Sequence, residues 1–408
     1  TQTVTVKMQK TPPAFVKDDG NKLLELSGDF GSTEAIKVSL PGDSVSTPSA
    51  GKIDLATGSS FTSIINAENI NASQVTTIGV IIEGDSKANS IVGSPQKDEI
   101  SGGGGSDVIE ASGGNDKVKY NSTATTIDGG SGLDSLVIVG SNDIIIDLTE
   151  TSSSQNQIKT ITDGTTTSAT GAIVKNFEDV DASAATGNIT IIGTDSDGSI
   201  STVMSSVGGI GNDIISGGSA SDTISGGNGN DTLNGYAGAD TISGGAGNDI
   251  ITGGAGADTL TGGDGTDTFI FVSSDLEEDP SSSIDAIKDL SSGEKIGIDN
   301  DLSWKKINIT DNTATPTLDN STKDAYIQKI GGKYLLVIEK AADGSSKGYV
   351  DLGTSKPGEP GKWSQETING INYLSIIENV APTLKITDTT AQVRETNFSG
   401  AGQVTKIL

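Results

Sequence analysis

Residues 244–269 read GGAGNDIITGGAGADTLTGGDGTDTF, and they repeat one pattern of nine residues. Two glycines open each unit, an aspartate stands at the sixth position and an apolar residue stands at the eighth. The pattern extends back to Gly208 without a gap, so that seven units fill residues 208–270. The aspartates at the sixth position are Asp213, Asp222, Asp231, Asp240, Asp249, Asp258 and Asp267. So strict a period predicts a solenoid in which every unit is one structural repeat.

A second array follows the same frame from Gly84 to about residue 146. Its eighth position is apolar in all seven units, but its sixth position is less regular. The sixth positions are Asn89, Asp98, Asp107, Asp116, Thr125, Asp134 and Asp143. Because the frame persists where glycines are lost, we expect one continuous coil over this region too.

Each unit of nine residues is long enough for a three-residue strand and a six-residue turn. Alternation along the strand points the middle, apolar side chain inward, and two units complete one turn of the coil. One aliphatic side chain per nine residues builds only a thin core, which does not offset the backbone entropy of nine ordered residues. The turns must therefore be stabilised by something other than apolar burial.

The composition of the turns indicates what stabilises them. Glycines allow tight backbone curvature, so that carbonyl oxygens converge, and the aspartate adds an anionic oxygen. Six to eight such oxygens suit Ca²⁺, whereas Mg²⁺ retains its waters and its octahedral geometry. Histidine and cysteine are absent, which excludes histidine or thiolate zinc sites. The candidate glycine ligands in the second array are Gly208, Gly217, Gly226, Gly229, Gly244, Gly247, Gly253 and Gly256.

Stacked turns bring together aspartates that lie two units apart. In residues 208–270 this predicts about five calcium ions, one between each pair of stacked aspartates. In residues 84–146 we expect one or two ions, held by Asp98, Asp116 and Asp134. Asp107 is a further candidate ligand, but its edge should be largely metal-free, since Thr125 brings no charge to the next turn.

The nonapeptides, GGAGNDIIT among them, resemble the calcium-binding repeats of the RTX (repeats-in-toxin) family. The resemblance implies a right-handed parallel β-roll with Ca²⁺ between turns, and type I secretion without an N-terminal signal. The segment SIDAIKDLSSGEKIGID, residues 283–299, looks like the cap of the roll in serralysin-type C-terminal domains. The serralysin protease itself is missing, because its zinc motif needs histidines.

The expected fold is all-β, with two such rolls, flanking β-rich segments and a C-terminal β cap. NAENINAS at 66–73 aligns with NFEDVDAS at 176–183, which indicates a duplicated header before each array. The predicted domains are an N-terminal β-rich segment (1–60), a header with the first roll (61–146), a Ser/Thr-rich linker with the second header (147–207), the second roll (208–270), the cap (271–378) and a tail that resembles the start of an Ig-like repeat (379–408).

The net charge of −28 disfavours nucleic acid and anionic membrane surfaces as partners and favours cations. No apolar run approaches the roughly 18 residues of a membrane helix. We expect no enzyme activity, because no nucleophile–base set is recognisable in the sequence. A glycosidase that uses carboxylates alone is not excluded by residue type, but no pair of acids stands out as a site.

The favoured function is that of a structural, extracellular protein of the bacterial cell surface, in an S-layer, an adhesin or a filament. Its expected partners are calcium and, through self-association or surface contacts, further copies, other surface proteins or polysaccharide. The alternative is a non-catalytic calcium-binding accessory region of a secreted enzyme. A metal-free solenoid, with aspartates acting only as turn formers, is the remaining alternative for each array.

Overall fold

The computed structural model describes residues 3–7, 23–28, 36–39, 51–55, 60–64, 69–149, 156–162, 167–168, 172–193, 203–271, 284–291, 293–298, 304–307, 323–330, 333–339, 347–352, 363–368 and 371–376. Every regular element among them is a β-strand, which confirms the all-β prediction. The tail at 379–408 lies outside the described residues, as do most of residues 1–60.

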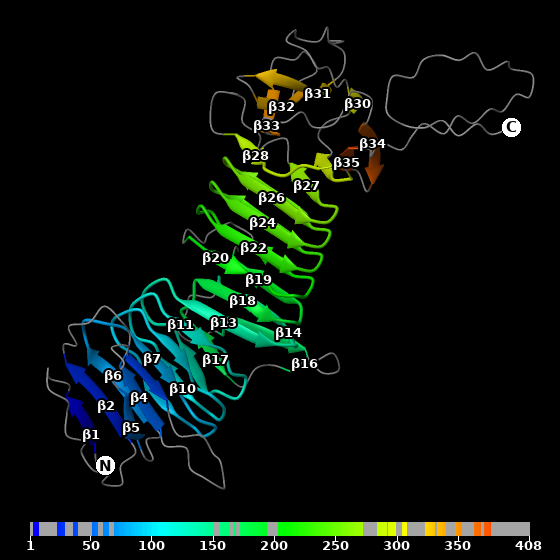
Figure 1. Cartoon of the computed structure of the whole chain (residues 1–408). Helices are drawn as coiled ribbons and strands as arrows, with labels where there is room; N and C mark the ends of the chain where they lie inside the picture. The colour runs from blue at the N-terminus through cyan, green and yellow to red at the C-terminus, as the bar shows by residue number, and fades with distance from the viewer. Residues whose placement is uncertain are drawn as a thin grey trace, which may run out of the picture.

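The arrays form one parallel coil, whose strands pair with strands one turn further along (Figure 1). Ile109 pairs with Ile127 and Leu233 with Ile251, so one turn takes 18 residues in both arrays, as predicted. We call the three sheets of the coil the first-array sheet, the common sheet and the second-array sheet. The first-array sheet contains β6 (Asn69–Val75), β8 (Ser90–Val92), β10 (Val108–Glu110), β12 (Thr126–Asp128) and β17 (Ile173–Lys175).

The common sheet runs through both arrays without interruption. It contains β7 (Val80–Glu83), β9 (Glu99–Ser101), β11 (Lys117–Lys119), β13 (Ser135–Gly140), β18 (Asp179–Ala185), β20 (Ser205–Val207), β22 (Thr223–Asn228), β24 (Thr241–Ala246), β26 (Thr259–Asp264) and β28 (Asp285–Ile287). The two predicted rolls are therefore joined by a shared sheet.

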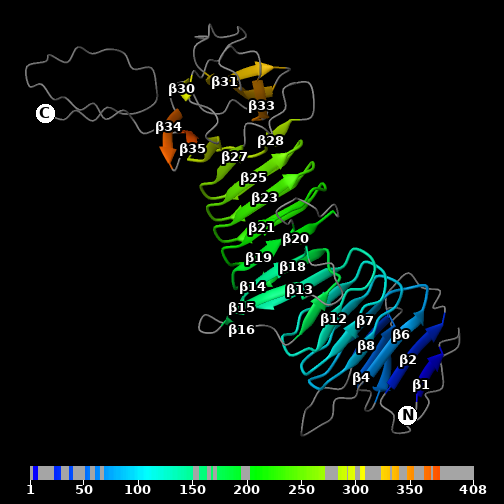
Figure 2. The same ribbon diagram turned by 180° about the vertical axis from the view of Figure 1, so that it is seen from behind.

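The second-array sheet replaces the first-array sheet at the junction (Figure 2). It contains β14 (Asp143–Asp147), β19 (Ile189–Ile192), β21 (Ile214–Ser216), β23 (Thr232–Ala237), β25 (Ile250–Ala255), β27 (Thr268–Phe271) and β29 (Lys295–Ile298). At the junction β12, β13 and β14 follow one another in three different sheets, and β17, β18 and β19 do the same. The coil therefore has three-stranded turns where one sheet gives way to another.

The two headers have the same strand topology. The first is built by β2 (Leu23–Gly28), β3 (Ile36–Ser39), β4 (Gly51–Leu55), β5 (Ser60–Ile64), β6 and β7, and the second by β13, β14, β15 (Ile158–Thr162), β16 (Thr167–Ser168), β18 and β19. In each, the first strand pairs in parallel with a seven-residue strand across a register shift, at 25/27 in one and 137/139 in the other. In each, the second strand begins an antiparallel meander. Residues 172–193 and 203–207, placed within a linker and header by the sequence, thus supply strands to the coil.

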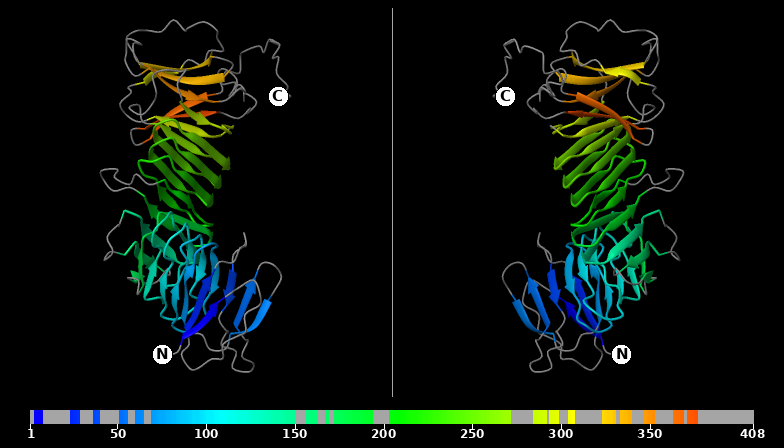
Figure 3. Two further views of the ribbon diagram at one scale, coloured as in Figure 1. Left: turned by 90° about the vertical axis from the view of Figure 1, so that its left-hand side faces the viewer. Right: turned by 90° about the vertical axis from the view of Figure 1, so that its right-hand side faces the viewer.

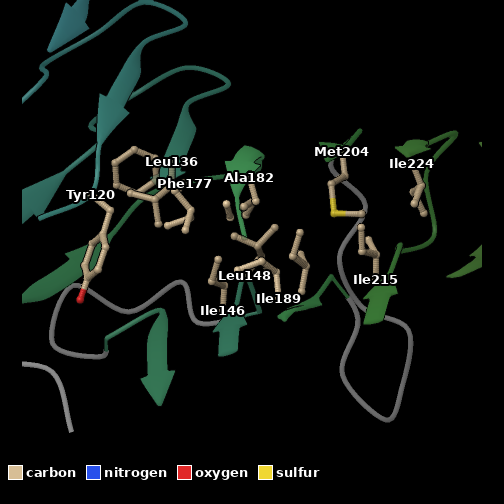
Figure 4. Close-up of a cluster of buried hydrophobic side chains, with 14 of the residues drawn as sticks. Tyr120, Leu136, Ile146, Leu148, Phe177, Ala182, Ile189, Met204, Ile215 and Ile224 are labelled. Atoms are coloured by element: carbon tan, nitrogen blue, oxygen red, sulfur yellow. The ribbon is translucent and has the colours of Figure 1, made fainter. Parts of the chain in front are cut away.

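A single hydrophobic cluster follows the axis of the coil through both arrays. The apolar residue at the eighth position of each unit of the second array is at most 1% exposed. Figure 4 shows the cluster at the junction, where Leu136 and Phe177 lie close together and Ile189, Met204 and Ile215 continue the row. The thin core predicted from the sequence is therefore present, but it is continuous rather than divided between two rolls.

Beyond β27 the chain closes the end of the coil (Figure 3). β28 extends the common sheet and β29 extends the second-array sheet, as expected for a cap at 283–299. β33 (Lys347–Asp351) pairs with β28, and β35 (Ile371–Ile376) pairs with β29 in the antiparallel sense. The remaining strands are β1 (Thr3–Lys7), β30 (Trp304–Ile307), β31 (Lys323–Ile330), β32 (Lys333–Glu339), β33 (Lys347–Asp351), β34 (Trp363–Ile368) and β35 (Ile371–Ile376).

Candidate metal-binding turns

The sixth-position aspartates form hydrogen-bonded ladders along the edges of the coil. The backbone N–H of Asp213 donates to Oδ1 of Asp231 at 2.7 Å, and that of Asp231 donates to Oδ1 of Asp249 at 2.8 Å. The other pairs of the second array are 249/267 at 2.9 Å, 222/240 at 2.7 Å and 240/258 at 2.9 Å. In the first array, 98/116 and 116/134 are joined in the same way at 2.8 Å. The structure thus brings together each pair of stacked aspartates proposed from the sequence.

The second carboxylate oxygen of many ladder aspartates is buried and lacks a hydrogen-bond partner among the described residues. These oxygens are Oδ2 of Asp116, Asp134, Asp231, Asp240, Asp249 and Asp267. Each belongs to an aspartate that follows another in a ladder. Where a ladder begins, Oδ2 is satisfied by its own turn, since Asp213 accepts from Gly209 N–H at 2.6 Å and Asp222 from Gly218 N–H at 2.7 Å. A buried anionic oxygen without a donor is costly unless something else compensates it.

Backbone carbonyls converge on the same places. A Cβ built on Gly226 would lie 2.2 Å from Oδ2 of Asp231 and 2.7 Å from the carbonyl oxygen of Gly244 in the next turn. The same pairing of a carboxylate and a next-turn carbonyl occurs at Gly208, Gly217 and Gly244, and Gly253 faces Oδ2 of Asp258. A carboxylate oxygen and a carbonyl oxygen from two successive turns therefore lie against the same glycine.

The glycines at the fourth position have a different role. Gly229, Gly247 and Gly256 have φ of 125°, 135° and 133°, in the region that favours glycine. The carbonyl group of Gly229 faces Gly247 and that of Gly247 faces Gly265, so that a Cβ at Gly247 would lie 1.7 Å from the carbonyl oxygen of Gly229. The predicted glycine positions are therefore those that permit close approach between turns.

Burial raises the pKa of the ladder carboxyls, because it penalises the charged form. The pKa rises to about 8 for Asp116, to about 7 for Asp231 and Asp240, and to about 6 for Asp98 and Asp249. Neighbouring carboxylates add to the effect at Asp116 and Asp231. None of Asp231, Asp240 and Asp249 forms an ion pair with a lysine or arginine of the described residues. The turns thus concentrate negative charge without a protein cation to balance it.

Within the described part of the chain, no cluster of three or more carboxylates lies close enough to hold a metal. Each turn supplies a single acidic side chain, so a hard cation here would take most of its ligands from backbone carbonyls. The oxygen-only donor set fits Ca²⁺, which accepts carbonyl and carboxylate oxygens in flexible geometry.

The Asp107 edge is built differently. The side-chain amide of Asn121 donates to Oδ2 of Asp107 at 3.2 Å, and the hydroxyl of Thr123 donates to the carbonyl of Gly105 at 2.7 Å. Asp107 still joins the ladder, since it accepts from Asn89 N–H at 2.8 Å. The carboxylate oxygen Oδ2, which lacks a donor at many other ladder positions, therefore has a protein donor at this edge.

The nine-residue frame places Asp143 two units after Thr125 and so predicts that the two residues stack at this edge, which is wrong. Asp143 does not stack on Thr125, because β14 belongs to the second-array sheet, where Oδ1 of Asp143 accepts from Asn188 N–H at 2.7 Å. The turn that follows Thr125 at this edge leads into β17 instead. The sequence keeps the nonapeptide frame through Asp143, but the extra strand of the junction places Asp143 at another edge of the coil.

Two acidic residues continue the ladders outside the nonapeptide arrays, and a third lies beside the last aspartate of one ladder. Asp258 N–H donates to Oδ1 of Asp285, and Asp134 N–H donates to Oε2 of Glu178 at 2.8 Å. Glu294 occupies the position in the next turn that corresponds to Asp267, and it is 1% exposed. Its pKa is raised to about 7, mainly by burial. These residues do not lie 18 residues from the aspartates beside them, so the period of the repeat does not predict them. Asp-Ala-Ile at 285–287 nevertheless keeps the order of aspartate, spacer and apolar residue.

An asparagine ladder parallels the aspartates on the edge of the second-array sheet. The side-chain oxygens of Asn188, Asn212 and Asn230 each accept the N–H one turn further on, at 2.7–2.8 Å. Asn212 and Asn230 stand at the fifth position of alternate units, just before the aspartate, whereas Asn188 precedes the array and is followed by Ile189. The recurrence of asparagine in GGIGND, GGNGND and GGAGND is the sequence signal of this ladder.

A family model of the RTX calcium-binding nonapeptide repeat, in four copies, matches residues 83–118, 207–242 and 234–269. The chain carries RTX calcium-binding repeats. The matches fall on both arrays, and RTX repeats bind Ca²⁺, are typically non-catalytic and suggest a secreted protein. No curated protein matched the chain. Among the residues that the structure describes, there is no helix long and apolar enough to cross a membrane.

Proposed function

We propose that this RTX protein is a structural component of the bacterial cell surface, in an S-layer, an adhesin or a filament, and that Ca²⁺ binding makes its coil rigid after secretion. The observation that carries the proposal is the row of buried carboxylate oxygens that have no donor among the described residues. Calcium at those oxygens would replace the missing donors and would neutralise charge that no nearby lysine or arginine offsets.

The ligands would be Asp213, Asp222, Asp231, Asp240, Asp249, Asp258 and Asp267, together with carbonyl oxygens of the glycine turns. This arrangement provides about five ions in residues 208–270, one for each stacked pair. Asp98, Asp116 and Asp134 would hold one or two more in the first array. The Asp107 edge would stay largely metal-free, because Asn121 and Thr123 already satisfy its oxygens.

A continuous coil suits a structural role. Its strands stack along one long axis around a core one side chain thick. Calcium would cross-link successive turns at both edges of the second array. Cytosolic Ca²⁺ is scarce and extracellular Ca²⁺ is plentiful, so the chain would remain flexible inside the cell and become stiff outside. The repeats would supply the scaffold for this role.

Native mass spectrometry of the full chain in calcium would test this assignment. We expect a mass increment of six to seven calcium ions, made up of about five in the second array and one or two in the first. Asp231→Asn should reduce that number, since Asp231 belongs to two stacked pairs. A chain that binds no calcium at millimolar concentration would contradict the proposal.

A further inference from the structure

The outer surface of the second array carries almost no charge. Residues 203–271 contain no Lys, Arg or Glu, and their only charged residues are aspartates. Seven of these are the buried ladder residues, so Asp264 alone is exposed. If calcium neutralises the ladders, this part of a chain with a net charge of −28 is close to neutral. The first array differs, since Glu99, Lys117, Lys119 and Glu110 point outward from its strands.

One row on the outer face of the second-array sheet alternates large and small side chains. Ile214, Thr232, Ile250 and Thr268 occupy neighbouring strands in register. Ile214 is 50% exposed and Ile250 is 41% exposed, although each is a large apolar residue on a sheet surface. Figure 2 views this face, with β19, β21, β23 and β25 stacked one above another. Exposed apolar side chains on a charge-free face mark a candidate interaction surface.

Because large and small side chains alternate, the row is complementary to the same row in the opposite order. A two-fold axis parallel to the strands, between β23 and β25, would place a second copy face to face with its strand order inverted. Ile214 would then face Thr268 of the other copy, and Ile250 would face Thr232. Each isoleucine thus meets a smaller side chain, which is the self-complementarity that an isologous contact requires.

The charge distribution favours the same partner. Two copies with a charge of −28 repel each other over most of their surfaces, so they approach best where both are neutral. The outer face of the common sheet is also uncharged in this region, but Thr223, Thr241 and Thr259 fill its equivalent row. Hydroxyl groups gain little from burial against each other compared with isoleucine. The second-array sheet is therefore the stronger candidate.

We propose that the outer face of β21, β23, β25 and β27 is a self-association surface on which a second copy of this chain docks with its strand order inverted. The inference rests on the calcium-loaded structural role proposed above and names the partner for it. Strands lie about 4.7–4.9 Å apart, so this face buries less than the roughly 800 Å² per partner of a stable complex. We therefore expect weak pairing that becomes effective when many copies lie side by side.

Sedimentation velocity of the full chain in calcium provides the first test. The sedimentation coefficient should rise with protein concentration for the wild type, and Ile250→Lys should keep the protein monomeric. Thr241→Lys is the matched control, because Thr241 occupies the same repeat position on the common sheet and should leave association unchanged. Circular dichroism in calcium separates the two proposals, since a variant that keeps its calcium-dependent β signal has not lost the fold.

Single cysteines test the register, because the chain has no cysteine of its own. Oxidation of an equal mixture of Thr232→Cys and Ile250→Cys chains should yield mainly the mixed disulfide, well above the statistical half. Thr223→Cys mixed with Thr241→Cys should give little cross-linking. A wild type that is monomeric at all concentrations, equal loss of association in both lysine variants, or a random distribution of disulfides would each overturn the inference.

Discussion

The two arrays share one coil and one sheet, but they close their turns in different ways. In the second array both edges carry aspartate ladders with buried oxygens that the described protein groups do not satisfy. In the first array one edge does the same, whereas the edge at Asp107 is closed by Asn121 and Thr123. On the function proposed above, the dependence on calcium would therefore reside in the turns rather than in the strands. At the Asp107 edge an amide and a hydroxyl from one divergent unit occupy the place that we propose for a cation at the other edges.

The largest contrast should come from the glycines. A Cβ at Gly247 would lie 1.7 Å from the carbonyl oxygen of Gly229 at a φ of 135°, so Gly247→Ala should cost several kcal/mol and disrupt the second array. Gly140→Ala is the control, since its φ of 106° is also unfavourable but no atom lies within 4 Å of the added Cβ. We expect it to cost about 1 kcal/mol. Thermal unfolding in calcium measures both, and equal losses would show that backbone conformation matters more than contact between turns.

Substitution of the carboxylates compares the two arrays at the level of the ligand. Asp249→Asn keeps an oxygen for the ladder hydrogen bond but removes a charge from two stacked pairs. The calcium concentration at the midpoint of folding should rise about tenfold, which corresponds to about 1.4 kcal/mol. Asp107→Asn makes the same change at the edge closed by Asn121 and should leave the midpoint within about twofold. Circular dichroism during a calcium titration gives both values, and a similar shift in the two variants would remove the distinction between the edges.

Proton binding should partly substitute for calcium. The folded-state pKa of Asp116 is about 8 and that of Asp231 and Asp240 about 7, whereas an unfolded aspartate titrates near 3.9. The calcium-free folded state therefore binds more protons than the unfolded chain between about pH 4 and pH 8. Its stability should increase as the pH falls through this window and decrease as the pH rises.

In saturating calcium the pH dependence should have the opposite sign, because protons compete with the ion for the same carboxylates. Urea unfolding at pH 5 and pH 8, with calcium and with chelator, tests both signs. Stability in chelator that is the same at the two pH values would mean that these carboxyls do not titrate in the folded state.

The smallest effect should come from the protein donor that closes the Asp107 edge. Asn121→Ala removes its amide and leaves Oδ2 of Asp107 without that donor, so the first array should lose about 1 kcal/mol. The loss should appear in calcium and in chelator alike. Urea unfolding followed by hydrogen exchange in β10 and β12 localises the effect. A loss that calcium restores fully would show that the edge binds metal once Asn121 is gone.

Periodicity predicted much of this structure. The frame of nine residues fixed the 18-residue turn, the inward row of apolar residues and the pairs of stacked aspartates. The cap at 283–299 was also expected, and its two strands do extend the sheets. These features follow from local repetition, in which every unit meets a neighbour like itself.

The junction could not be predicted in the same way. The joining of the arrays through the common sheet depends on β17 and β18, whose pairing with β12 and β13 spans about 45 residues, many of them outside the nonapeptide frame. Asp143 was displaced by the extra strand, and Glu178 and Asp285 were missed because their spacing is not 18. Asn121 was overlooked because a donor that replaces a cation lies outside the repeat pattern. Each failure occurs where the chain departs from its own period.

Hydrogen exchange of the full chain, in millimolar calcium and in chelator, tests the central claim most directly. With calcium, the amides of β21 to β27 and those of β10 and β12 should all be protected. In chelator, protection of β23 and β25 should fall at least about a hundredfold, which corresponds to about 2.7 kcal/mol, while β10 and β12 keep a larger share of theirs. Equal protection of β23 and β25 in both solutions would contradict the account, since the second array would then be held by packing and hydrogen bonds alone.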